Sequence, residues 1–159
     1  LHPRVRRQRQ MCIRDRITPN DCVRNGKGQV VGIRLVEKGG KERIAPVLNE
    51  YKDRVTSIVD KAQEATKPLF RAYDSHIDKH RFRAEYCAAL LRQLEREEAQ
   101  GKPWFGGDLS PKNYIHLSGR DAKCGGTYRG HPTQVVSAVS GAMGHNRLEI
   151  VFSHYNYTD

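Results

Sequence analysis

Near its C-terminal end the sequence gathers residue types that suit phosphoryl transfer. Gly144 ends an apolar run with helical spacing, His145 follows at once, and Tyr155 stands directly behind a second histidine. A glycine can take the left-handed conformation that ends a helix, so we expect His145 at a helix C-terminus. A tyrosine hydroxyl can act as a nucleophile when neighbouring groups activate it. The common alternatives are a surface histidine and a core tyrosine, and Tyr157 competes for the nucleophilic role.

Two patterns upstream carry basic side chains that can act on the same phosphate. His80 and Arg83 are three residues apart in the opening turns of an expected helix, so their side chains are neighbours on its surface. The planar guanidinium of arginine matches two phosphate oxygens. Lys38 lies beside Gly39-Gly40, where a flexible ammonium can protonate a leaving alkoxide. Each pattern alone is common in proteins as a solvated histidine, a surface arginine or a turn lysine.

The elements that must position these residues follow from hydrophobic periodicity. Residues 29–47 form two β-rich runs around a Gly-Gly turn, which predicts a hairpin. Helical spacing then predicts an amphipathic helix from Leu48 to about Thr66, closed by Pro68, with a core face of Leu48, Tyr51, Val55, Ile58, Val59 and Ala62.

A second and a third helix are predicted further along the chain. Asp78 suits the N-cap of a helix that runs to about Ala99, with a core face of Phe82, Tyr86, Ala89, Leu90 and Leu94. Residues 100–130, rich in glycine, predict a long loop with a short strand at residues 114–117. Pro132 suits the first turn of a final helix, whose expected buried side is Val135, Val136, Val139, Ala142 and Met143. Residues 147–153 suit a two-turn helix.

Composition narrows the class of partner. The chain has 159 residues and a formal net charge of +10, which favours an anionic partner, most often nucleic acid.

Its four cysteines contain no C-x-x-C pair, so we expect reduced thiols and neither a zinc site nor a disulfide framework. A zinc site from His76, His80 and Cys87 lacks a suitable spacing. No run approaches the roughly 18 apolar residues of a membrane helix, so we expect no membrane partner.

Residues 1–16 are rich in arginine and lack an apolar pattern. They suit either a basic arm that contacts phosphates or a non-native segment, since MCIRDR resembles translated sequencing-adapter DNA. We favour the second explanation and place the domain at residues 17–159, with a loop insertion at 100–130.

Four patterns in this order resemble the catalytic domain of tyrosine recombinases: KGGKER on a hairpin, H-x-x-R opening a helix, G-H after a helix, and a tyrosine near the C-terminus. The segment SGAMGHNRLEIVFSHY is similar to the ends of integrases from phages and conjugative elements. The resemblance covers about residues 18–157. It implies an α+β fold that is mostly helical and contains a small antiparallel β-hairpin sheet.

The resemblance also implies roles for individual residues. Tyr155 matches the nucleophile that forms a 3′-phosphotyrosine and frees a 5′-hydroxyl, and Arg83 matches a clamp on the non-bridging oxygens. His80 and His145 match the histidines that bind the phosphate and assist proton transfer, and Lys38 matches the general acid. No metal or other cofactor is implied. The expected DNA contacts beside them are Lys41, Arg43, Arg81 and Arg147.

One departure bears on activity. The family's first catalytic arginine stands in an R-x-x-E helix upstream of the hairpin, and residues 17–37 offer no such helix. We therefore expect the C-terminal part of a catalytic domain, inactive alone, that binds double-stranded DNA and forms a homo-oligomer on DNA when complete. A bacterial cytoplasmic, nucleoid-associated location follows. The alternatives are a DNA-binding module without catalysis and a type IB topoisomerase, which shares the chemistry.

Overall fold

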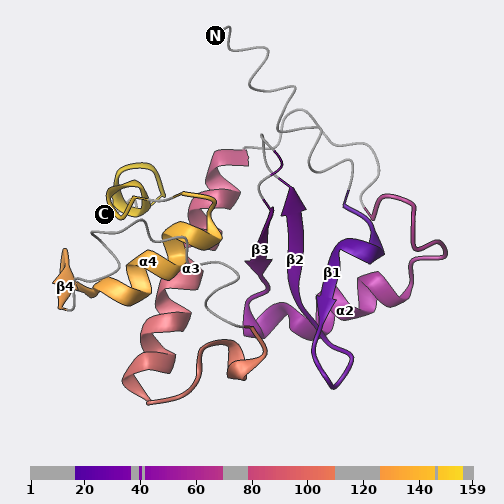
Figure 1. The fold of residues 1–159 in the computed structure, drawn as a ribbon, viewed down its shortest axis with the longest axis horizontal. Coiled ribbons are helices and arrows are strands. Elements are labelled where there is room, and N and C mark those ends of the chain that lie inside the picture. Colours follow the sequence, from indigo (N-terminus) through magenta and orange to yellow (C-terminus); the bar gives the residue numbers. More distant parts are fainter. Residues whose placement is uncertain are drawn as a thin grey trace, which may run out of the picture. The chain divides into compact units, whose positions relative to one another are not determined.

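The computed structural model describes residues 17–36, 40, 42–69, 79–109, 126–145 and 147–155, and among these not the side chains of Lys79, His154 and Tyr155. The chain divides into two compact units, residues 1–76 (the N-terminal unit) and residues 77–159 (the C-terminal unit). Each unit combines helices with short antiparallel strands (Figure 1). The predicted mixture of helices with a small antiparallel sheet is confirmed at this level. The domain boundaries of 17–159 remain a prediction.

A three-stranded antiparallel sheet forms the centre of the N-terminal unit. Its strands are β1 (Cys22–Arg24), β2 (Val30–Val36) and β3 (Glu42–Pro46), in the order β1-β2-β3. The hairpin predicted over 29–47 is therefore present as β2 and β3, with Arg34 opposite Ile44. Strand β1 was not predicted, because three residues without clear alternation carry no strand signal. Lys38 and Lys41, at the turn, lie outside the described residues.

The helix of this unit is shorter than its sequence suggests. A 3₁₀ turn at Asn49–Tyr51 leads into α2 (Lys52–Asp60), so the prediction of a helix to Thr66 was wrong at its end. After the buried Val59 the sequence offers only small or polar residues until Pro68, so no packing extends the helix. The predicted core face was wrong for Tyr51 and Ile58, which are exposed. The core consists of Val30, Val47 and Val59, with Cys22, Ile33, Val55 and Leu69 packed against them.

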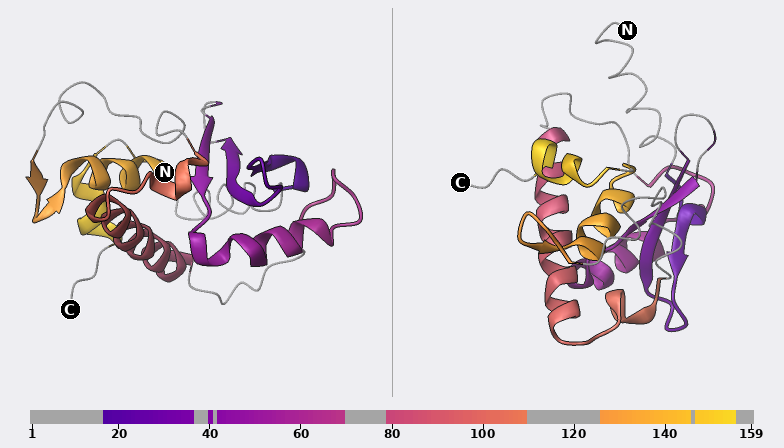
Figure 2. Two further views of the ribbon diagram at one scale, coloured as in Figure 1. Left: turned by 90° about the horizontal axis from the view of Figure 1, so that it is seen from below. Right: turned by 60° about the vertical axis from the view of Figure 1, so that its left-hand side comes forward.

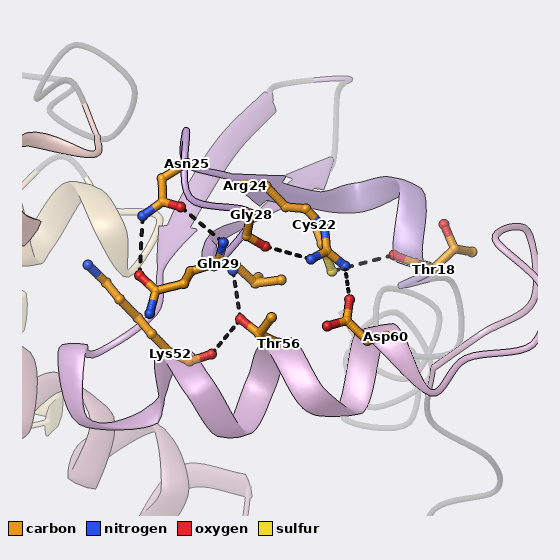
Figure 3. A network of polar contacts seen from close by, with 10 residues as sticks. Thr18, Cys22, Arg24, Asn25, Gly28, Gln29, Lys52, Thr56 and Asp60 are labelled. Carbon is orange, nitrogen blue, oxygen red and sulfur yellow. Dashed lines mark hydrogen bonds and ion pairs between the residues drawn. The ribbon is translucent and has the colours of Figure 1, made fainter.

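Polar side chains fasten α2 to the sheet (Figure 3). The backbone N–H of Val30 donates to the hydroxyl oxygen of Thr56 at 2.8 Å, and that hydroxyl donates to the carbonyl of Lys52 at 2.6 Å. Arg24 donates to the carbonyl oxygen of Gly28 and pairs with Asp60 at 2.7 Å. Through these two contacts Arg24 connects β1 both to the β1–β2 turn and to the end of α2.

Two helices in contact form the body of the C-terminal unit. The long α3 (Lys79–Ala99) packs against α4 (Thr133–Ala142) and against the short π-helix η6 (Val151–Tyr155), as Figures 1 and 2 also show. The predicted helix to Ala99 is confirmed, although Asp78 lies outside the described residues. Its predicted core face was wrong at Phe82, whose exposed fraction is 53%. The buried stripe is Ala84, Cys87, Leu90, Leu91 and Leu94, which turns Phe82 toward solvent.

The segment predicted as a long loop contains more structure than expected. A 3₁₀ turn at Trp104–Gly107 (η3) has three successive residues with positive φ, and the first of them is the buried Phe105. The N–H of Phe105 donates to a carboxylate oxygen of the buried Glu97 at 2.9 Å, which fixes the turn against α3. Strands β4 (Thr127–Tyr128) and β5 (His131–Pro132) form a hairpin. The strand predicted at 114–117 lies outside the described residues.

Helix α4 follows directly from β5 and matches its prediction closely. Every residue of α4 except Gln134 is buried, and so is Met143 after it, as predicted for the apolar positions. Gly144 has φ of 82°, which confirms the left-handed helix end. No helix in the described part of the chain is long and apolar enough to cross a membrane.

Candidate functional site

Arg83 connects α3 to the end of α4. Its Nη2 donates to the carbonyl oxygen of Met143 at 2.7 Å, and its Nε atom is itself buried. The last carbonyls of a helix have no partner within the helix and carry partial negative charge, so a guanidinium there is favourable. This contact brings the predicted H-x-x-R helix to the residue that directly precedes Gly144-His145.

The backbone around Gly144 forms a Schellman helix end. The N–H of Gly144 donates to the carbonyl of Gly141, and the N–H of His145 donates to the carbonyl of Ser140, both at 2.9 Å. The hydroxyl of Ser140 donates in turn to the carbonyl of Arg147 at 2.9 Å. Residues on both sides of His145 are therefore tied to α4, and the half-buried His145 has a defined place next to the Arg83 contact.

His80 lies on the first turn of α3, three residues before Arg83, and is exposed. Residues three apart on a helix have neighbouring side chains. A phosphate bound over the start of α3 can therefore meet His80 and Arg83 together. His80, Arg83 and His145 all belong to the C-terminal unit, and the Arg83–Met143 bond joins the two sequence patterns.

The remaining predicted catalytic residues are only partly visible. The backbone of Tyr155 closes η6, which packs against α3 and α4, but its side chain is outside the described structure. Tyr157 and Lys38 lie wholly outside the described residues. How Tyr155 and Lys38 stand toward the phosphate therefore remains a prediction.

The expected DNA contacts are exposed or half-exposed where they are described. Arg81 pairs with Glu85 at 2.8 Å and Arg147 with Glu149 at 3.7 Å, and all four side chains are largely solvated. Solvated ion pairs of this kind contribute little to stability, so their arginines can exchange a carboxylate for a phosphate. Arg43 is half-buried on β3 of the N-terminal unit. Lys41 lies outside the described residues.

Cys87 lies on the buried face of α3 and is not a nucleophile. Its exposed fraction is 1%, and burial raises the pKa of its thiol to about 12, against a smaller lowering by Arg83. The thiolate is the reactive and metal-binding form, so Cys87 is inert at neutral pH. Among the described residues no group of three His, Cys, Asp or Glu side chains can hold a metal ion.

Sequence reasoning missed the rings that surround η6. The ring of Phe152 lies 5.1 Å from that of His131 and 5.9 Å from that of Tyr128, and the guanidinium of Arg129 stands 5.6 Å over it. His131 also contacts Glu95 of α3. These residues come from four elements, β4, β5, α3 and η6, so no local pattern in the sequence predicts the cluster.

Comparisons with protein-family models, with curated proteins and with solved structures find no match to this chain.

Proposed function

We propose that this chain is the C-terminal part of the catalytic domain of a tyrosine recombinase, an integrase that breaks and rejoins DNA through a 3′-phosphotyrosine. One observation carries the proposal: Nη2 of Arg83 bonds the carbonyl of Met143 at 2.7 Å. It joins the H-x-x-R helix to the G-H turn, two patterns whose order in the sequence suggested the family. The two patterns are thereby in contact within one compact unit, as a shared phosphate site requires.

The proposed chemistry assigns one task to each residue. The Tyr155 hydroxyl gives its proton to one of the two histidines as its oxygen forms a bond to phosphorus. The bond to the 5′-oxygen breaks, and Lys38 gives that oxygen a proton. Arg83, His80 and His145 hold the non-bridging oxygens while negative charge develops on them. The bond of Arg83 to Met143 uses one of the guanidinium N–H groups and fixes the plane in which the others point.

The chain is proposed to be incomplete as an enzyme. Residues 19–36 form a 3₁₀ turn and strands β1 and β2, which differ from the helix that carries the family's first arginine. Arg24, the arginine between residue 17 and β2, is bound to Gly28 and Asp60. The 159-residue chain is therefore expected to bind double-stranded DNA without cutting it, and a longer chain is expected to act as a homo-oligomer on DNA in the bacterial cytoplasm.

The test uses a chain extended upstream of residue 17 by an arginine helix and a clamp domain. A duplex nicked near the scissile phosphate should trap a covalent adduct on a denaturing gel. Tyr155→Phe should abolish the adduct and leave DNA affinity nearly unchanged, because only the nucleophilic oxygen is lost. Arg83→Ala should slow adduct formation by roughly a hundredfold or more.

Tyr157→Phe is the matched control and should leave the adduct intact. Loss of the adduct in Tyr157→Phe alone would move the nucleophile by two residues. If no form of the chain gives an adduct but DNA binding persists, the second candidate, a DNA-binding module without catalysis, is correct. The involvement of Arg24 in the fold and the net charge of +10 favour that candidate.

A further inference from the structure

Phe152 is the residue of η6 that meets the β4–β5 hairpin. Its ring contacts the rings of Tyr128 and His131 and lies under the guanidinium of Arg129, at centroid distances of 5.9, 5.1 and 5.6 Å. Ring pairs at such distances, and a guanidinium over a ring face, attract each other. Phe152 stands three residues before Tyr155 in the same π-helix.

His131 and Glu95 connect that hairpin to α3. Nδ1 of His131 lies 2.5 Å from Oε1 of Glu95, and the side chains are 29% and 31% exposed. This distance is that of a hydrogen bond between the imidazole and the carboxyl group. The pair spans from the long helix to β5, and the same imidazole ring contacts Phe152. His131 thus links α3 to η6 through one side chain.

The hairpin turn has backbone geometry that side chains rarely adopt. Arg129 and Gly130 both have positive φ, 52° and 84°, as in a type I′ turn. A non-glycine residue there is strained by roughly 1–2 kcal/mol. Antiparallel pairing of Thr127–Tyr128 with His131–Pro132 fixes the turn. The turn places the guanidinium of Arg129 over the ring of Phe152.

We propose that Glu95 and His131 are positioning residues that hold η6, and with it the backbone of Tyr155, in place against α3. Glu95 binds His131 of the β4–β5 hairpin, and the hairpin contacts η6 at Phe152. The purpose of this positioning rests on the proposed function of Tyr155. The attachment of η6 to α3 through Glu95, His131 and Phe152 does not depend on that function.

The experiment measures hydrogen exchange by mass spectrometry in the peptide that covers residues 148–155, with a peptide from α3 as reference. His131→Phe keeps a ring beside Phe152 and removes the bond to Glu95. We expect it to speed exchange in 148–155 by roughly three- to tenfold while α3 stays near its original rate. Phe152→Leu should act in the same direction.

A rescue separates positioning from general stabilisation. Glu95→Gln should loosen 148–155 less than His131→Phe, because an amide oxygen can still accept. The double exchange Glu95→His with His131→Glu should restore most of the protection that either single change removes. Gln134→Ala, an exposed change beside the hairpin, is the matched control and should change nothing.

Unchanged exchange in 148–155 for His131→Phe and Phe152→Leu would overturn the proposal. So would equal acceleration in α3 and 148–155 for every variant, because the contacts would then stabilise the whole unit. Since exchange needs no DNA, this result is independent of whether a tyrosine–DNA adduct ever forms.

Discussion

Arg83 reaches from α3 to the carbonyl oxygen of Met143, which gives it a structural role beside its proposed catalytic one. Arg83→Ala removes a charge-assisted bond at a helix C-terminus. We expect the free energy of unfolding to fall by about 1–2 kcal/mol, measured by urea denaturation. Arg81→Ala, whose ion pair with Glu85 is exposed, should cost about 0.5 kcal/mol or less. Equal losses in both variants would show that the Met143 contact contributes nothing to stability.

Cys87 predicts a dependence of stability on alkaline pH. Burial raises the pKa of its thiol from 9.0 to about 12, so between these values the folded chain keeps a proton that the unfolded chain releases. The stability is fully present below pH 9 and declines as pH rises toward 12, by up to about 1.4 kcal/mol per pH unit. Cys87→Ala should flatten the decline relative to the parent chain in urea titrations at several pH values. A parallel decline in both would exclude the thiol as its cause.

Gly144 sets the direction in which the chain leaves α4. Its φ of 82° lies in the region that only glycine adopts without strain. Gly144→Ala should lower the free energy of unfolding by about 1–2 kcal/mol, read from thermal unfolding. Gly26→Ala is the control, since nothing lies within 4 Å of a Cβ there and its φ is not positive. A milder effect at Gly144 than at Gly26 would contradict a strained helix end.

At the scale of elements, the sequence predicted those features that depend only on neighbouring residues in the chain. The hairpin over 29–47, the start of α4 near Pro132 and the left-handed Gly144 follow from turn and cap chemistry. The end of α2 and the exposure of Phe82 do not, because packing against neighbouring elements decides how far a helix extends and which of its faces is covered. The candidate site divides in the same way. The sequence indicated Arg83 and His145, but the carbonyl that Arg83 binds and the contacts of Phe152 are tertiary.

At the scale of the whole molecule, charge predicts how DNA should be bound. Half of the net charge of +10 comes from the arginine-rich residues 1–16, and the remainder is spread over residues 17–159. Binding to duplex DNA should weaken steeply with salt, with a log–log slope of roughly −3 or steeper, as counterion release requires. Fluorescence anisotropy between low and physiological salt measures it.

A chain that begins at Ile17 is the control for this prediction. It should keep a shallower salt dependence if the folded units themselves contact phosphates. Loss of all binding in the shorter chain would place the whole DNA affinity in residues 1–16 and leave the folded units without a DNA surface. Binding that ignores salt would contradict phosphate contacts in either form.

The composition of helix α4 has a consequence for how the chain folds and aggregates. Its sequence TQVVSAVSGA contains no charge and is rich in valine, serine, threonine and glycine, which are weak helix formers. The helix therefore exists because α3 and η6 cover it. Until they do, during synthesis or after partial unfolding, the segment is an uncharged stretch whose valines and threonine favour strands. Such stretches can pair between molecules, so α4 is a segment from which aggregation of this chain can begin.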